Sequence, residues 1–300
     1  MLKSKFFTYF LIIYQAVLIA FTNITAKQAA MEVDPFVITF FRYIIGVSVL
    51  GSIVLIRGSK IKIDWADLKT LLFLMFTGMF FNQILFAQAL AFTVPSHPPM
   101  IYALTPIVII FIDIIRHKKM ASKQIILASL LSLIGVGIVL GKNIMVFNSS
   151  ILLGDMLIFL AMLCWSFYTS FGKKMVHKYG ALELILILLI GATILYAPWG
   201  IHRTIQADLS LISSKGWLSI LYLGVFSSGL SYLNYFMILK RIEATQTGLI
   251  IALHPPATLI LSILLGYEFF EWHIVAGTAL IILALWISQT KVKVIDKSQR

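Results

Sequence analysis

The sequence predicts an all-α integral membrane protein with ten transmembrane helices arranged as two inverted five-helix repeats. Three observations lead to this fold class. The 300 residues are 60% hydrophobic and only 12% charged, whereas a soluble domain averages roughly 45–50% apolar and about 25% charged residues. Ten apolar runs are long enough to cross a bilayer. Two of these runs carry proline at matching positions, Pro106 and Pro255.

Ten apolar runs approach or exceed the roughly 20 residues that cross about 30 Å of hydrocarbon. We expect spans at residues 6–27, 35–57, 68–91, 95–115, 122–141, 151–173, 181–201, 216–239, 246–267 and 272–290. The connectors between them are short and polar, and none is long enough to hold a folded extramembrane domain. Functional groups are therefore expected within the membrane or directly beside it.

The basic residues predict the orientation, because Lys and Arg accumulate on the cytoplasmic side of membranes. With the amino terminus inside, all but five of the 24 Lys and Arg residues fall in cytoplasmic segments. The five are Lys27, Arg42, Lys142, Arg203 and Lys215. This separation predicts a multi-pass protein of the cytoplasmic (inner) membrane with both termini in the cytoplasm. The net charge of +12 is spread over alternate loops, which indicates contact with lipid headgroups and no nucleic-acid partner.

A weak internal repeat relates the two halves of the chain. Placing residue n beside residue n+149 aligns Leu104 and Pro106 with Leu253 and Pro255, and the register continues on both sides. Proline removes a helix hydrogen bond and crowds the preceding turn. We therefore expect Pro106, Pro255 and the adjoining Pro256 to break spans four and nine at corresponding positions.

Each repeat holds five spans, and an odd number of crossings turns the second copy upside down in the membrane. We expect one repeat at residues 1–142 and the second at residues 143–300, which includes a short cytoplasmic tail. Broken helices that meet near the midplane of an inverted repeat are typical of secondary transporters.

Several stretches carry a family resemblance over essentially the whole chain. They are "PFVITFFRYIIG" with its arginine between aromatic residues, the Trp165-Ser166 pair, the two proline positions, and "LLGYEFFEWHIVAGTALIILALWIS". In these the chain resembles the EamA-type ten-helix permeases of the drug/metabolite transporter superfamily. The resemblance implies a cavity lined by spans 1, 3, 4, 6, 8 and 9, with spans 5 and 10 peripheral. The chain departs from the family at Lys119. In the alignment of the two repeats Lys119 is the counterpart of Glu268, at a position where the family often has a second glutamate. The expected role of Glu268 is gating or structural pairing.

Polar side chains inside apolar spans must find a partner or a water-filled space, and they supply the candidate substrate contacts. The candidates are amide, imidazole and aromatic side chains within the spans: Asn82, Gln83, Tyr102, Trp165, Tyr168, Asn234, Tyr235 and His254. For each amide, the alternative is an interhelical hydrogen bond without contact to substrate. For the aromatic residues, the alternative is packing or a place in the interfacial belt.

Two ionisable residues within the spans have a more specific prediction. Arg42 stands about 10 Å below the outer surface at a rise of roughly 1.5 Å per residue, and it either pairs structurally or gates the substrate path. His254 precedes two prolines, whose missing N–H groups should leave the carbonyls of Ile251 and Ala252 without helix bonds. Its imidazole either caps those carbonyls, or contacts substrate and carries a proton, because imidazole titrates near physiological pH.

Motifs for enzymatic chemistry are missing from the sequence. It contains no nucleotide-binding P-loop, no H-E-x-x-H and no G-x-S-x-G, and its single cysteine, Cys164, precludes an intrachain disulfide. We therefore expect no metal, no cofactor and no enzymatic activity. Gly137 and Gly141 form a G-x-x-x-G, which is expected to pack against a neighbouring helix.

The resemblance and the composition together predict a secondary transporter of small organic metabolites such as amino acids or hydrophobic amines, with export as the expected direction. The expected mechanism is alternating access across the cytoplasmic membrane. Its partners are the small-molecule substrate and the lipid bilayer, proton or ion coupling is an option, and the protein is a monomer or a homodimer. The alternative is a membrane-embedded enzyme acting on a lipid-linked substrate, which would need clustered acids, a metal site or a large polar loop.

Overall fold

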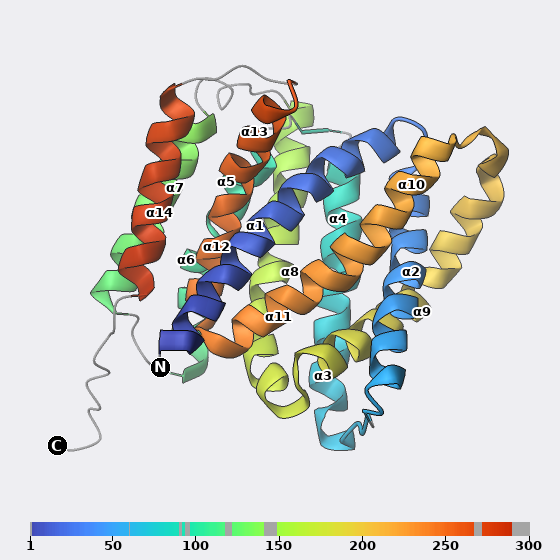
Figure 1. Cartoon of the computed structure of the whole chain (residues 1–300), viewed down its shortest axis with the longest axis horizontal. Coiled ribbons are helices and arrows are strands. Elements are labelled where there is room, and N and C mark those ends of the chain that lie inside the picture. Colours follow the sequence, from blue (N-terminus) through green and yellow to red (C-terminus); the bar gives the residue numbers. More distant parts are fainter. Residues whose placement is uncertain are drawn as a thin grey trace.

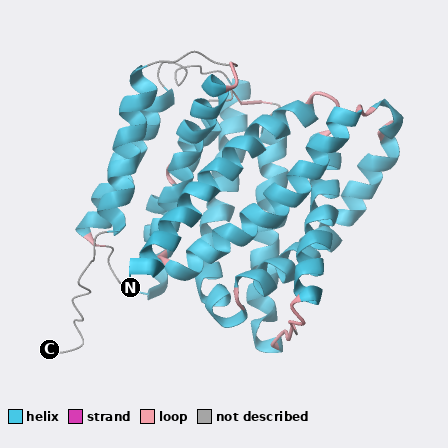
Figure 2. Ribbon diagram, in the orientation of Figure 1, coloured by secondary structure: helices cyan, strands magenta, loops and turns pink. Residues whose placement is uncertain are grey.

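The computed structural model describes residues 2–59, 61–89, 92–93, 97–117, 122–140, 149–266 and 272–289. Within these ranges every regular element is a helix and no β-strand occurs (Figure 2). The prediction of an all-α fold is therefore confirmed for the part of the chain that the structure describes.

Helical segments occupy all ten ranges in which spans were expected. In the first half they are α1 Leu2–Ala30, α2 Pro35–Ile56, η1 Trp65–Asp67, α3 Leu68–Leu74, η2 Met75–Phe81, α4 Asn82–Ala89, α5 His97–Tyr102, α6 Thr105–His117 and α7 Lys123–Leu140. In the second half they are α8 Ser149–Tyr179, α9 Ala181–Gln206, η4 Leu209–Leu211, α10 Ser214–Tyr222, η5 Leu223–Ser231, α11 Tyr232–Arg241, α12 Ala244–Ile250, η6 Ile251–Leu253, α13 His254–Leu264 and α14 Trp272–Gln289. Among the described residues, seven continuous helical stretches are long and apolar enough to cross a membrane. Shorter helices cover the expected spans four, five and ten.

Spans three and eight change to π-helical geometry in their middle. Segment η2 lies between α3 and α4, and segment η5 lies between α10 and α11. A π-helix bonds each N–H to the carbonyl five residues earlier, and short π segments are frequent at functional sites. The two segments coincide when the chain is aligned at the spacing of 149 residues, so they are corresponding features of the two halves.

Span four breaks between α5 and α6, where a break was expected. Pro106 has no N–H to donate to the carbonyl of Tyr102. The Thr105 hydroxyl donates to that carbonyl at a distance of 2.6 Å. A peptide oxygen that would be unpaired in the membrane is thereby satisfied.

Span nine breaks at the corresponding place, at η6. Here the backbone N–H of His254 donates to the carbonyl of Ile251, and the Thr258 hydroxyl donates to the carbonyl of His254 at 2.9 Å. The expectation that the Ile251 carbonyl would lack a helix bond is therefore wrong. The tight 3₁₀ turn supplies the donor that Pro255 cannot, and both Pro255 and Pro256 are buried at the start of α13.

The helices form a bundle in which α7 and α14 pack together at one edge and α2 packs against α9 near the other (Figure 1). Helix α1 and the α10–η5–α11 segment run obliquely across one face, and α8 lies behind them against α4, α6 and α11. The largest buried apolar cluster joins α2, α3, η2, α8, α9 and α11 and includes Tyr43, Tyr168 and Phe236. The residues discussed below lie in and beside this core.

Spans five and ten touch backbone to backbone at two glycines. A β-carbon on Gly135 would lie 2.9 Å from the Gly277 oxygen, and one on Gly277 would lie 2.6 Å from the Gly135 oxygen. Gly137, which was expected to pack in this way, has open space around its missing side chain, and Gly141 lies outside the described residues. The packing role predicted for Gly137 is therefore wrong, because residues two apart point to nearly opposite sides of an α-helix.

Gly135→Leu is expected to lower the stability of the purified protein by about 1–3 kcal/mol, the usual cost of overpacking. The leucine side chain would enter the space that the backbone of α14 occupies. Gly137→Leu, on the same helix, is the matched control and should leave stability unchanged. Thermal unfolding in detergent measures both variants, and an equal loss in the two would contradict the assigned packing.

Candidate substrate-binding site

Asn82 and Gln83 lie at the start of α4, directly after the π-helical segment η2. The Asn82 amide donates to the Tyr102 hydroxyl at 2.7 Å and to the Ala161 carbonyl at 2.8 Å. The Gln83 amide donates to Asn82 Oδ1 at 3.0 Å and to the Tyr232 hydroxyl at 3.2 Å. These bonds join spans three, four, six and eight. We call Asn82, Gln83, Tyr102 and Tyr232 the central amide cluster.

Trp165 of α8 stands beside three tyrosine rings. The ring centroid of Trp165 lies 5.2 Å from that of Tyr168, 5.1 Å from that of Tyr235 and 6.1 Å from that of Tyr232. The hydroxyls of Tyr235 and Thr169 share a hydrogen bond of 2.7 Å. We call Trp165, Tyr168, Tyr232 and Tyr235 the aromatic cluster. Because Tyr232 belongs to both clusters, the two are contiguous.

The two clusters provide hydrogen-bond donors, acceptors and ring faces without a formal charge. An amide group can donate hydrogen bonds through its NH2 and accept them through its oxygen. Aromatic ring faces attract apolar groups and cations. The Tyr168 hydroxyl is buried and has no hydrogen-bond partner among the described residues. Since an unpaired buried hydroxyl costs about 1–3 kcal/mol, it is a polar group available to a ligand.

Asn234 belongs to a separate network that ties span eight to span one. Its amide donates to the Leu11 carbonyl at 2.9 Å and to Gln15 Oε1 at 2.8 Å. The Gln15 amide donates to the Ser231 hydroxyl at 2.9 Å. This network shares no residue with the central amide cluster. For Asn234, the geometry therefore matches the interhelical alternative stated from the sequence.

Arg42 of α2 contacts two hydroxyls of the π-helical segment η5. Its Nε–H donates to Ser228 Oγ at 2.8 Å, and its Nη2 donates to Ser227 Oγ at 3.1 Å. Within the described ranges, no carboxylate forms an ion pair with it. In this structure the hydrogen-bond partners of the Arg42 guanidinium are therefore two neutral hydroxyls.

His254 is half-buried at the start of α13. In the part of the chain that the structure describes, its imidazole makes no hydrogen bond, and the Ile251 carbonyl is bonded by the backbone N–H of His254. The two broken spans meet nearby, because a β-carbon on Gly248 would lie 3.3 Å from Pro106 Cα. Glu268 lies outside the described residues.

A histidine–aspartate pair between spans four and six was not predicted. His97 Nδ1 lies 2.7 Å from Asp155 Oδ2, and the Thr93 hydroxyl donates to Asp155 Oδ1 at 2.5 Å. Asp155 lies near the start of α8, and only 17% of its side chain is exposed. In the sequence His97 stands at the start of expected span four, directly before Pro98 and Pro99, and nothing there marks it as a partner of span six.

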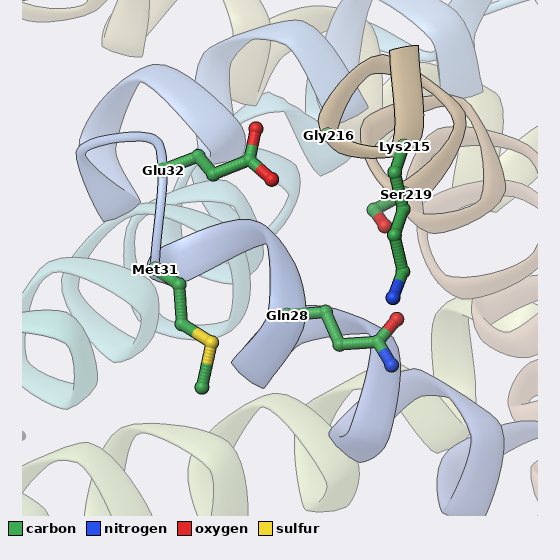
Figure 3. Close-up of a pocket in the computed structure, with 6 residues that line it drawn as sticks. All are labelled: Gln28, Met31, Glu32, Lys215, Gly216 and Ser219. Carbon is green, nitrogen blue, oxygen red and sulfur yellow. The ribbon is translucent and has the colours of Figure 1, made fainter. Parts of the chain in front are cut away.

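Two cavities lie away from these clusters. An apolar groove of about 600 Å³ runs between α1, α13 and α14, with Val17 and Ile260 among its lining residues. A pocket of about 80 Å³ lies between the end of α1 and the start of α10, where Figure 3 shows Glu32 and Lys215. Hydrogen bonds from the hydroxyl and the backbone N–H of Ser213 lower the pKa of Glu32. None of the eight candidate substrate contacts lines either of these two cavities.

Comparison with protein families gives a match over nearly the whole chain. Residues 6–141 and 152–290 each match the EamA-like transporter family. An "Uncharacterized transporter" of Archaeoglobus fulgidus is 24% identical over 272 residues, which are 90% of this chain and 93% of that protein. The "Uncharacterized transporter YyaM" of Bacillus subtilis is 27% identical over 210 residues, 69% of this chain and 68% of that protein.

A solved crystal structure has the same fold. It superposes on this chain with a TM-score of 0.77 and covers 93% of this chain and 95% of its own. Sequence identity over the superposition is 19%. The helical arrangement described above is therefore one that an experimentally determined protein also adopts.

Proposed function

The chain belongs to the EamA-like transporter family, and we propose that it exports small organic metabolites, such as amino acids or hydrophobic amines, by alternating access. It is a multi-pass integral membrane protein, with a small molecule as its substrate and the bilayer as its solvent. The observation that carries the proposal is the central amide cluster, which joins four spans through neutral hydrogen bonds. These side chains can exchange such neutral hydrogen bonds for bonds to a substrate, and form them again after its release, without separating buried charges.

We also propose that residues 1–142 and 143–300 form two inverted repeats. Support comes from the π-helical segments and the helix breaks, which occur at corresponding positions. It also comes from Gln83 and Tyr232, which are 149 residues apart and hydrogen-bonded to each other. Corresponding residues of a two-fold repeat can touch only near the symmetry axis, so this bond would mark the centre of the bundle. Rocking of one repeat against the other around such a centre is the usual form of alternating access.

The proposed location is the cytoplasmic membrane with both termini in the cytoplasm. This orientation follows from the distribution of Lys and Arg over the connectors. It places the ends of α1, α4 and α13 and the start of α5 at the outer surface. In Figure 1 the ends of α1 and α13 lie on the same side of the bundle.

Transport by the purified protein in liposomes tests the function. We expect saturable movement of at least one member of a labelled panel of amino acids and hydrophobic amines, and none in protein-free liposomes. Repeating the assay with an imposed proton or sodium gradient measures coupling, and cross-linking in the same liposomes measures the oligomeric state. Inside-out and right-side-out vesicles give the direction.

The second candidate function predicts a different result in the same preparation. A membrane-embedded enzyme acting on a lipid-linked substrate would form product without any gradient and without moving the panel compounds. Among the described residues no group of three His, Cys, Asp or Glu side chains could hold a metal ion. Product formation in the absence of transport would contradict the proposal.

A further inference from the structure

Arg42 carries a positive charge within the membrane, and the groups that hold it are neutral. It is the eighth residue of α2, about 10 Å from the helix start at a rise of roughly 1.5 Å per residue. Ser228 and Ser227 accept hydrogen bonds from it. Asp34, which caps the same helix, lies 3.7 Å from Arg203, so this acid has another basic partner.

Two hydroxyls do not neutralise a guanidinium. A charged side chain at mid-membrane costs at least about 2.5–3.5 kcal/mol, and dipoles recover only part of that. A guanidinium has five N–H donors, and the two serines accept two of them. Because Ser227 and Ser228 accept through their oxygens, their O–H groups remain as donors, and neither donates to another group in the described residues. The arrangement offers N–H donors, O–H donors and one positive charge, which is the complement of an anion.

This donor group lies about one helical turn from the aromatic cluster. Ser228 of η5 precedes Tyr232, the first residue of α11, by four residues along the same span. A molecule touching both Arg42 and Tyr232 would therefore need to carry an anionic group and an apolar group.

We propose that Arg42, Ser227 and Ser228 bind the carboxylate of the transported substrate, while its apolar or aromatic body contacts the aromatic cluster. A carboxylate matches the geometry of a guanidinium, which can donate two parallel N–H bonds to it. The inference rests on the proposed transport function and narrows its substrate to small organic carboxylates, including zwitterionic amino acids. Hydrophobic amines without a carboxylate are then poor substrates.

Equilibrium binding to the purified protein in nanodiscs tests the inference without requiring transport. The probes are labelled phenylacetate, 3-phenylpropionate and 4-phenylbutyrate, each compared with its primary amide, which has nearly the same shape and no charge. We expect the wild type to bind at least one carboxylate about tenfold or more tightly than its amide, because hydrogen bonds between ionised groups are the strong ones.

Four variants test which residues cause the preference for a carboxylate over its amide. Arg42→Gln should abolish it, and Arg42→Lys should keep part of it, because lysine retains the charge without the planar fork. Combined Ser227→Ala and Ser228→Ala should reduce carboxylate affinity severalfold. Arg203→Gln is the matched control, an arginine beside Asp34 at the outer end of α9, and should bind like the wild type.

The outcomes separate the inference from the proposed function. Equal affinity for carboxylates and amides, a preference that survives in Arg42→Gln, or no binding of any probe would overturn the carboxylate site. A purely structural Arg42 would change the melting temperature and leave the carboxylate-to-amide ratio intact. If Arg42→Gln does not fold, the ratio of carboxylate to amide affinity in Arg42→Lys and in the double serine variant tests the carboxylate site instead. Arg42-dependent binding without any transport would refute the proposed function alone, and transport without carboxylate preference would refute this inference alone.

Discussion

Gly78→Ala is expected to destabilise the protein by about 3 kcal/mol, at the upper end of the usual cost of overpacking. A β-carbon on Gly78 would overlap the ring of Tyr168. That ring is fully buried and packs against Trp165 and Phe236, so it has no free space to move into. Helix propensity alone favours alanine over glycine by about 1 kcal/mol. The contact with the Tyr168 ring therefore turns an expected gain in stability into an expected loss. Thermal unfolding in detergent measures the change.

Gly229 provides the matched control for this prediction. It is buried in the other π-helical segment, and the nearest atom to its missing β-carbon is 3.5 Å away, an ordinary contact. Gly229→Ala should therefore be as stable as the wild type or slightly more so. Combining Gly78→Ala with Tyr168→Ala should cost less than the sum of the two single changes. Equal melting temperatures for Gly78→Ala and Gly229→Ala would contradict the contact.

The positions of the spans could be predicted because the bilayer imposes a strong and local requirement. Each crossing needs a long apolar run with internally bonded backbone, and such runs are visible without knowing their neighbours. The helix breaks were predictable for the same reason, since Pro106 and Pro255 lack a donor wherever they stand. Ser227 and Ser228, by contrast, show no sign in the sequence that they hold Arg42, which is about 185 residues away.

The π-helical segments could not be predicted from the local sequence. The residues of η2 and η5 contain no proline and read as ordinary apolar helix with small residues. What distinguishes them lies on other spans: the Tyr168 ring covers Gly78, and Arg42 bonds the hydroxyls of η5. Local propensity does not contain these contacts, which depend on how the helices are placed.

The candidate residues could be selected from the sequence but not grouped. Asn82 and Asn234 were chosen on the same grounds, yet they bond to different helices. A rotation of a helix by a few tens of degrees exchanges one set of neighbours for another, and hydropathy does not fix that rotation. Tyr232, which joins the two clusters, is a span tyrosine of the same kind as the aromatic candidates but was not one of the eight candidate substrate contacts. The repeat spacing could have identified it, because it is the counterpart of Gln83.

Asn82→Leu is expected to lower the transport rate at least tenfold with a smaller effect on stability than Gly78→Ala. Leucine has as many non-hydrogen side-chain atoms as asparagine, so no cavity opens, but the Tyr102 hydroxyl loses its donor and the Gln83 amide loses an acceptor. A tenfold change corresponds to about 1.4 kcal/mol, which lies within the roughly 1–3 kcal/mol cost of an unpaired buried polar group. Initial uptake rates in liposomes, normalised to folded protein, measure the effect.

Asn234→Leu separates a loss of transport from a loss of packing. Asn82 and Asn234 are both 3% exposed and each donates two hydrogen bonds. Asn234→Leu should lower the melting temperature while each folded molecule keeps most of its transport rate, because its bonds tie span eight to span one outside the central amide cluster. Equal loss of transport in both variants would remove the special role of that cluster.

The bond between Asn82 and Tyr102 can then be tested directly with Tyr102→Phe. If the two side chains act through their 2.7 Å hydrogen bond, the double variant should transport no more slowly than Asn82→Leu alone, because the hydroxyl has already lost its donor. Such non-additivity is the signature of residues that work as one unit. Additive losses would mean that Asn82 and Tyr102 contribute separately, and the cluster would then be two independent contacts rather than one exchangeable hydrogen bond at the centre of the carrier.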